Sequence, residues 1–367
     1  MHLAANRAEL SKVLGHVRRA ATGRATLPIC ANVLLEAREG TLHLTGHGDE
    51  WGLQASLPAR VEGEGTVSVP ARAFAEAVAG LTSEEVTIES GEGDVVHLAG
   101  DACRYTFHGL PAAEYPALPT VEGTTLTIPA KRLREMISAA LPCVSTDETR
   151  AMLTGVLLRQ DADGLQVVAT DSYRLALLRC REATGEECSA VVPGQILGEL
   201  GRLIGKGADT CMLTVSDTHC RCEVGGYSLT SRLIEGSYPG YDRVLDQMAK
   251  TGVKVGLTLD RKAFQAALRR AAVMASAEAG KVVFSPDGSG LRLQAESADL
   301  GRVSEEIVCV MEGERFQAAF DAEYLLDALR SIRSREVQWN WTASLEASVL
   351  RPTDSEEVFY AIMPMQL

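Results

Sequence analysis

The chain has no long hydrophobic run and no stretch that resembles a secretion signal. No segment of its 367 residues approaches the ~18 apolar residues that a membrane helix needs. The first nine residues, Met-His-Leu-Ala-Ala-Asn-Arg-Ala-Glu, lack the apolar core of a signal peptide. These absences predict a cytoplasmic protein that does not associate with membranes.

The nine cysteines lack the spacing of a disulfide framework or a metal site. Residues 219–222, His-Cys-Arg-Cys, resemble a metal cluster, but no second Cys or His pair lies near them in the sequence. In a strand, Cys220 and Cys222 would point to one face and His219 to the other. We therefore expect reduced, buried thiols and neither a metal nor another cofactor.

Recognisable catalytic motifs are also missing. Residues 204–207, Ile-Gly-Lys-Gly, lack the remaining glycine and the Ser or Thr of a phosphate-binding loop, and there is no Gly-x-Ser-x-Gly elbow. Aspartate and glutamate are plentiful, but they form no recognisable catalytic cluster. The residues thus show no catalytic site that we recognise. One enzymatic hypothesis stays open, a metal- or thiol-dependent enzyme built around His219 and the cysteines, and metal analysis of the purified protein would reveal it.

One layout is present three times in the chain. Residues 3–10, 126–133 and 257–264 each run from a short apolar strand into a helix, and each unit later contains a strand that turns into a second helix. Pro70 and Pro193, which mark this second junction in the first two units, lie 123 residues apart. A period of this length indicates a repeated domain rather than a solenoid repeat.

Each unit reads as alternating strands and two helices, with the helices on one side of antiparallel sheets. The pattern predicts an α+β fold of three repeated domains, which we bound at residues 1–122, 123–251 and 252–367. Trp339 and Trp341 share one face of a predicted strand, which is typical of core residues.

Positive charge is scarce, because 36 lysines and arginines stand against 49 aspartates and glutamates, a net charge of −13. Such a chain is not a general nucleic-acid binder unless its basic groups gather on one face. The first helix of each unit does carry basic residues opposite its apolar stripe: Lys12, Arg19, Lys131, Arg134, Lys262 and Arg269. This face is either ordinary solvated surface or a surface that contacts phosphates without reading sequence.

Two segments resemble signatures of one family. Residues 168–176, Val-Ala-Thr-Asp-Ser-Tyr-Arg-Leu-Ala, resemble the Ala-Thr-Asp-Gly/Ser-His/Tyr-Arg-Leu-Ala signature of the bacterial β sliding clamp. Residues 363–367, Met-Pro-Met-Gln-Leu, resemble the family's terminal Met-Pro-Met-Arg-Leu. Shorter matches lie at residues 24–29, 69–74, 110–116 and 238–241. The resemblance covers the whole chain in order.

The resemblance implies a processivity factor of DNA polymerase III that does no chemistry. Two chains would form a head-to-tail homodimer, a closed ring with pseudo-sixfold symmetry, of which one chain is half. Sheets would form the outside and two helices per domain would line the hole, around duplex DNA held without sequence preference. The implied partners are the polymerase III catalytic subunit, the clamp loader and other proteins with a clamp-binding motif.

The resemblance also implies a hydrophobic pocket between the second and third domains that receives this short motif. By motif match, the pocket residues are Leu153, Thr170, Ser172, Tyr173, Arg174, Leu175, Pro239, Arg243, Val244, Tyr324, Ala361, Ile362, Met363, Pro364 and Met365. Methionines suit a pocket that accepts varied sequences.

Two smaller sets complete the candidates. For DNA contact we add to the basic helix faces the three arginines Arg24, Arg72 and Arg150. For the ring contact we infer four apolar residues, two on a first-domain strand and two near the end of a third-domain helix: Tyr105, Phe107, Val273 and Met274.

The chain also departs from the family pattern. Gly194 and Gln195 stand where the family often has Lys or Arg, Ala279 stands where some relatives have an aromatic residue, and Gln366 replaces the terminal basic residue. These departures leave open a second reading, an accessory or antibiotic-tolerant clamp paralogue beside the housekeeping clamp.

Overall fold

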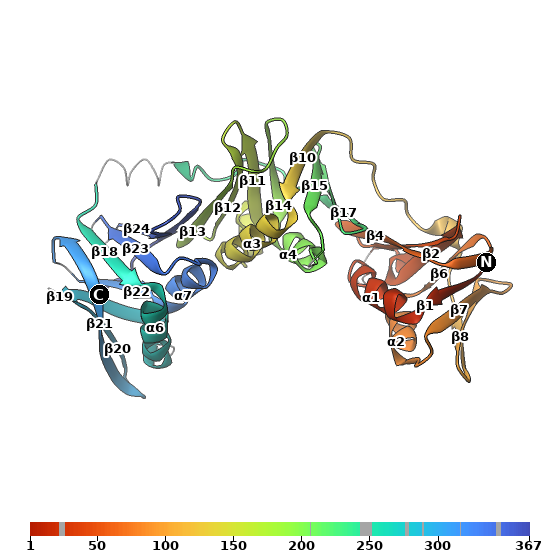
Figure 1. Cartoon of the computed structure of the whole chain (residues 1–367), viewed down its shortest axis with the longest axis horizontal. Helices are drawn as coiled ribbons and strands as arrows, with labels where there is room; N and C mark the ends of the chain where they lie inside the picture. The colour runs from red at the N-terminus through yellow and green to blue at the C-terminus, as the bar shows by residue number, and fades with distance from the viewer. Residues whose placement is uncertain are drawn as a thin grey trace. The chain divides into compact units, whose positions relative to one another are not determined.

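The computed structural model describes residues 1–21, 26–205, 207–242, 252–275, 279–287, 290–315, 317–342 and 346–367. The chain separates into two compact units, unit 1 (residues 1–131 and 202–233) and unit 2 (residues 132–201 and 234–367). Figure 1 labels many of the helices and strands of both. Within the described ranges, no helix is both long enough and apolar enough to cross a membrane.

Unit 1 contains two antiparallel sheets, the helices α1 (Arg7–Val17) and α2 (Ala71–Gly80), and the short 3-10 turns η1 (Pro28–Ala31) and η2 (Ala112–Glu114). The five-stranded sheet has the order β5 (Arg60–Gly63), β1 (His2–Asn6), β7 (Glu85–Ser90), β8 (Val95–Gly100) and β9 (Cys103–His108). The eight-stranded sheet has the order β10 (Thr124–Pro129), β15 (Thr210–Val215), β16 (His219–Val224), β17 (Tyr227–Arg232), β4 (Trp51–Pro58), β3 (Thr41–His47), β2 (Asn32–Arg38) and β6 (Gly65–Pro70).

Unit 2 is built on one twelve-stranded antiparallel sheet. Its order is β14 (Cys188–Pro193), β11 (Gly155–Asp161), β12 (Gly164–Thr170), β13 (Arg174–Cys180), β25 (Val358–Ile362), β24 (Ser348–Pro352), β23 (Glu336–Trp341), β18 (Val255–Asp260), β21 (Gly301–Gly313), β20 (Gly290–Ser297), β19 (Lys281–Asp287) and β22 (Ala318–Asp321). The remaining elements are α3 (Ala130–Ala140), η3 (Leu141–Cys143), η4 (Glu148–Thr154), α4 (Gly194–Leu203), α6 (Arg261–Ala275) and α7 (Ala322–Ser331).

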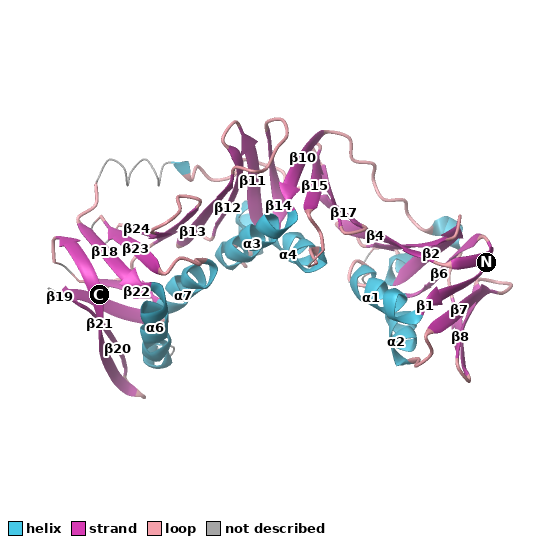
Figure 2. Cartoon of the chain, viewed as in Figure 1, coloured by secondary structure: helices cyan, strands magenta, loops and turns pink. Residues whose placement is uncertain are grey.

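The repeated strand-to-helix layout is confirmed. β1, β10 and β18 lead directly into α1, α3 and α6, and β6, β14 and β22 lead into α2, α4 and α7 (Figure 2). Two of these junctions carry a side-chain cap: Asp260 Oδ1 accepts from the Ala263 N–H at 2.9 Å, and Asn6 Oδ1 accepts from the Glu9 N–H at 3.1 Å. Each cap satisfies a backbone donor that the first helical turn would otherwise leave open.

Apolar side chains on one helical face hold each helix to its sheet. In α6, Phe264, Leu268 and Ala271 are fully buried, as the helical spacing predicts. Trp339 and Trp341 lie in the same core, and their ring centroids are 4.9 Å apart. The prediction that these tryptophans are core residues is confirmed.

The compact units divide the chain differently from the three consecutive domains expected from the repeat. The central strands β15–β17 join the sheet of β2–β4 through the pair β17–β4, whereas β11–β14 join the C-terminal strands through the pair β13–β25. Edge strands of a repeat carry unpaired backbone groups, and pairing with the edge of the next repeat satisfies them. The domain boundaries at residues 122 and 251 therefore stay a proposal.

Candidate functional site

A cavity of about 170 Å³ opens in unit 2 where η4, the β12–β13 turn, the segment after Tyr238 and the C-terminal strand meet. Its lining is Leu153, Thr170, Ser172, Tyr173, Arg174, Leu175, Pro239, Gly240, Tyr241, Ala347, Ala361 and Met363. Nine of these twelve residues are among the predicted pocket residues. Apolar groups dominate the lining, with a few polar groups at its edge, which is the usual character of a ligand site.

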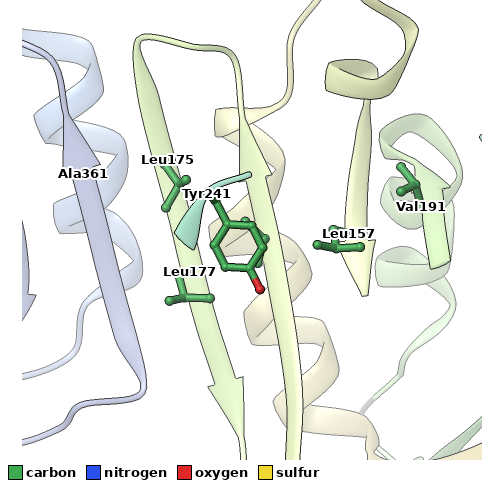
Figure 3. Close-up of a cluster of buried hydrophobic side chains, with 7 residues drawn as sticks. Leu157, Leu175, Leu177, Val191, Tyr241 and Ala361 are labelled. Carbon is green, nitrogen blue, oxygen red and sulfur yellow. The ribbon is translucent and has the colours of Figure 1, made fainter. Parts of the chain in front are cut away.

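The floor of the cavity rests on a buried apolar cluster (Figure 3). Leu175 on β13 and Ala361 on β25 are paired across the two strands, and both belong to this cluster. Tyr241 joins them, and its hydroxyl donates to Gln166 Oε1 at 3.0 Å. The cluster fixes the floor because every member is at least nine-tenths buried.

The β12–β13 turn forms one wall and is tied by its own side chains. Thr170 Oγ1 donates to the Arg174 carbonyl at 2.7 Å and accepts from the Ser172 N–H at 3.1 Å. Asp171 Oδ1 accepts from the N–H groups of Tyr173 and Arg174, both at 2.9 Å. This is the local turn that Asp and Thr side chains favour, and it presents Tyr173, 60% exposed, at the rim.

The positive charge of Arg174 is balanced by two neighbouring carboxylates. Its Nε donates to Asp171 Oδ2 at 3.1 Å and its Nη1 to Asp327 Oδ2 at 2.7 Å. Its guanidinium carbon lies 4.2 Å from the centroid of the Tyr324 ring. The side chain is only 14% exposed, so these contacts fix its orientation and make it a rigid polar part of the wall.

The chain terminus is anchored beside the cavity. The Met363 N–H donates to the Tyr173 carbonyl at 2.8 Å, and the Met365 N–H donates to the Ala319 carbonyl at 2.7 Å. Met363 lines the cavity, whereas Ile362 is buried and is not part of the lining. Such anchoring is unusual for a chain end, which normally frays.

Several predicted pocket residues lie outside the lining. They are Tyr324, which stacks on Arg174, and Ile362, Pro364 and Met365. Arg243 and Val244 lie outside the described residues. The residues that sequence reasoning missed are Gly240, Tyr241 and Ala347. The first two fall within the matched segment 238–241, whereas Ala347 carries no signal in the sequence.

The predicted DNA-contacting residues are exposed wherever the structure describes them. Lys12 lies in α1 and Arg19 just follows it, and the others on first helices are Lys131, Arg134, Lys262 and Arg269. Arg72 is 87% exposed, and its Nε lies 2.9 Å from Glu76 Oε1 one turn along α2. Arg150 lies in η4, and Arg24 falls outside the described residues.

The candidate ring-contact residues occupy two separate places. Tyr105 and Phe107 alternate along β9, the edge strand of its sheet, and the Phe107 ring lies 5.4 Å from that of Phe74. Val273, 62% exposed, and the half-buried Met274 lie in the last turn of α6. Among the described strands, residues 301–308 of β21 pair with β20 on one side only.

The nine cysteines all lie in the described ranges and form no disulfide, and seven of them are buried. Cys220 and Cys222 lie buried on one face of β16, as expected, and burial raises the pKa of Cys220 to about 12. Such a thiol is a poor nucleophile near neutral pH. The expectation of burial is wrong for Cys103, which is exposed because β9 is an edge strand, and for the half-buried Cys188.

Comparisons with known proteins agree with this architecture along the whole chain. Three family models match it: the N-terminal, central and C-terminal domains of the DNA polymerase III beta subunit, at residues 1–119, 127–240 and 251–366. A beta sliding clamp from Synechocystis sp. is 32% identical over 394 aligned positions that cover 100% of both chains.

Solved structures give the same answer. The DNA polymerase sliding clamp of Bacillus subtilis is 26% identical with a TM-score of 0.94, covering 100% of this chain and 99% of that one. A sliding clamp from Bartonella birtlesii, bound to griselimycin, is 25% identical with a TM-score of 0.92 and covers 100% of both. Since the models, the relatives and the fold agree from end to end, the chain belongs to the family of DNA polymerase III beta subunits, the non-enzymatic sliding clamps of DNA replication.

Proposed function

We propose that this clamp closes into a head-to-tail homodimeric ring around duplex DNA and tethers its partners through the cavity of unit 2. The partners are the polymerase III catalytic subunit, the clamp loader and other proteins that carry a short clamp-binding motif. The observation that carries the proposal is the cavity itself: nine residues predicted from motif matches line one apolar site with a fixed floor.

The size of the cavity limits what it holds. About 170 Å³ takes one or two apolar side chains, so the ligand is a short extended segment of about five residues rather than a folded surface. Such a ligand buries far less than a standard protein interface, and we expect a Kd near micromolar. The exposed rim residues Tyr173 and Met363 allow the site to adjust to different sequences.

The proposed DNA surface consists of the first helix of each repeat. Each of these helices has one exposed lysine on the same face: Lys12 in α1, Lys131 in α3 and Lys262 in α6. We call these three residues the helix lysines. On second helices, Arg72 is paired with Glu76 and Arg330 with Asp327, which reduces their charge toward a phosphate. A small number of phosphate contacts gives weak, sequence-independent binding that permits sliding.

The proposed ring contact joins the β9 edge of one chain to the open edge of β21 in its partner. Both edges expose backbone donors and acceptors that a facing strand satisfies. Tyr105 and Phe107 on one side and Val273 and Met274 on the other add apolar area. Two heterologous contacts of this kind close a ring of two chains.

We also propose three consecutive domains with boundaries at residues 122 and 251, and a cytoplasmic location.

Isothermal titration calorimetry tests the pocket: a peptide that copies the clamp-binding segment of a polymerase III catalytic subunit should bind with a micromolar Kd. A scrambled peptide of the same composition is the control. Equal binding of both peptides, or of neither, contradicts the proposal.

An accessory or antibiotic-tolerant clamp is the second candidate. α4 begins with Gly194 and Gln195, and a Cβ at Gly194 would lie 3.0 Å from a Val144 methyl and 3.1 Å from the Thr154 carbonyl. The packing thus disfavours a long basic side chain at this place. Depletion of the housekeeping clamp in the source organism separates the two candidates, because only a housekeeping protein supports growth alone. Tight binding of griselimycin would contradict antibiotic tolerance.

A further inference from the structure

Arg150 joins two segments that both line the cavity. It sits at a kink of η4, with φ −110° and ψ 61°, between two 3-10 turns. Its Nε donates to Asp147 Oδ2 at 2.9 Å and its Nη2 to Ser145 Oγ at 3.2 Å, and both of these residues lie just before η4. Its Nη1 reaches the β12–β13 turn, where it donates to Ser172 Oγ at 3.1 Å and to the Asp171 carbonyl at 3.4 Å.

We propose that Arg150 is a positioning residue of the peptide pocket, which holds the Ser172 turn, and with it Tyr173, against the wall formed by Leu153. Leu153 belongs to the same 3-10 segment as Arg150, so one guanidinium ties two walls of the cavity together. This inference rests on the proposed peptide-binding function. It differs from the prediction that Arg150 contacts DNA, which stays a separate prediction.

The turn needs holding because of its backbone. Ser172 has a φ of +83°, a left-handed conformation that residues with a Cβ rarely adopt. Such a conformation persists only where surrounding contacts impose it. The Ser172 N–H is bound by Thr170 Oγ1, and the hydroxyl is bound by Arg150. Loss of the second bond therefore releases the side of the turn that faces the cavity.

The geometry requires arginine rather than any cation. The guanidinium presents donors in several fixed directions, and here they reach Asp147, Ser145 and Ser172 at once. A lysine keeps the charge but cannot reach all three. Hydrogen bonds from Thr149 hold the pKa of the Asp147 carboxyl below its usual value, so Asp147 remains an anionic anchor at neutral pH.

The substitution Arg150→Lys separates a positioning role from a phosphate contact. It keeps the charge, so the salt dependence of DNA binding should not change. It removes the bond to Ser172, so the Kd for the polymerase-derived peptide should rise about tenfold, as for loss of one charge-assisted hydrogen bond. Ser172→Ala should weaken peptide binding comparably, and the double variant should be no weaker than the worse single one. Arg351→Ala is the matched control, since this exposed arginine bonds Gln338 away from the cavity.

A rescue distinguishes this role from general destabilisation. Glycine adopts the left-handed conformation without strain, so Ser172→Gly should reduce the penalty of Arg150→Lys to about twofold or less. The inference about Arg150 is overturned if Arg150→Lys binds the peptide as well as wild type does. It is also overturned if Arg150→Lys raises the Kd as much in the Ser172→Gly protein as in wild type. Neither result affects the proposed function. A wild-type protein that does not bind the peptide overturns the proposed function together with the inference. Circular dichroism and thermal melting check that each variant is folded. If Arg150→Lys does not fold, the peptide affinity of Ser172→Ala tests the inference instead.

Discussion

Deletion of residues 363–367 should weaken peptide binding severely without unfolding the protein. The deletion leaves β25 intact, because that strand ends at Ile362. It removes two backbone hydrogen bonds, from Met363 to the Tyr173 carbonyl and from Met365 to the Ala319 carbonyl. At about 0.5–1.5 kcal/mol each, their loss lowers the free energy of unfolding by about 1–3 kcal/mol, less than the total stability of an ordinary domain.

The deletion should weaken peptide binding by a larger fraction than it lowers the stability of the fold. Met363 is one wall of the cavity, and a methionine side chain buried by a ligand contributes about 1.5–3 kcal/mol. Release of the Tyr173 carbonyl adds about 1 kcal/mol. Together these losses raise the Kd by roughly 60- to 700-fold, from about micromolar to tens or hundreds of micromolar.

The matched control is deletion of Gln366 and Leu367 alone. Both residues are exposed and neither lines the cavity, so this shorter protein should bind the peptide within about twofold of wild type. Calorimetry on the three proteins gives the answer. If the protein without residues 363–367 binds the peptide as well as the full chain does, the peptide site must lie elsewhere.

Three further predictions concern other surfaces. Replacing Val273 and Met274 with alanine should shift the dimer toward monomer in sedimentation velocity, whereas the distant Arg351→Ala should not; an unchanged dimer counts against the assignment of the ring contact. Replacing the three helix lysines with alanine should flatten the salt dependence of DNA affinity by about three units of slope, and an unchanged slope would remove these helices from the DNA surface. Arg270 holds the pKa of Glu305 below its ordinary value of 4.5. The stability from this ion pair is therefore present above about pH 4.5 and is lost as the pH falls through the lowered pKa. In a plot of the free energy of unfolding against pH, Glu305→Gln should make the fall on the acidic side less steep. An equally steep fall would show that other carboxyl groups control the acid sensitivity.

The sequence predicts the local structure of this protein better than its long-range pairing. A strand followed by a helix with one apolar face is a local pattern, so all six strand-to-helix junctions could be predicted directly from the sequence. The pairing of β13 with β25 brings Arg174 opposite Ile362, 188 positions further along the chain. Alternation shows which face of a strand is buried, but not which strand lies beside it.

The candidate site shows the same division. Residues within the matched segments, such as Thr170 and Leu175, were predicted because the family signature runs through them. Ala347 was missed because its place in the lining follows from the pairing of β24 with β25, in which the next residue, Ser348, lies opposite Ile362. Arg150 could be recognised as an exposed basic residue, but the sequence does not show that its guanidinium reaches across to Ser172. That contact exists only once η4 and the β12–β13 turn are folded together.

The most direct test of the central claim is topological. The protein is loaded onto closed circular DNA by a clamp loader, separated from free protein by gel filtration, and the circle is then cut once. A closed ring held by topology should stay with the circle and slide off the linear DNA, and blocking both ends of the linear DNA should retain it. Protein that remains on the unblocked linear DNA, or that leaves the intact circle at the same rate, would contradict the account.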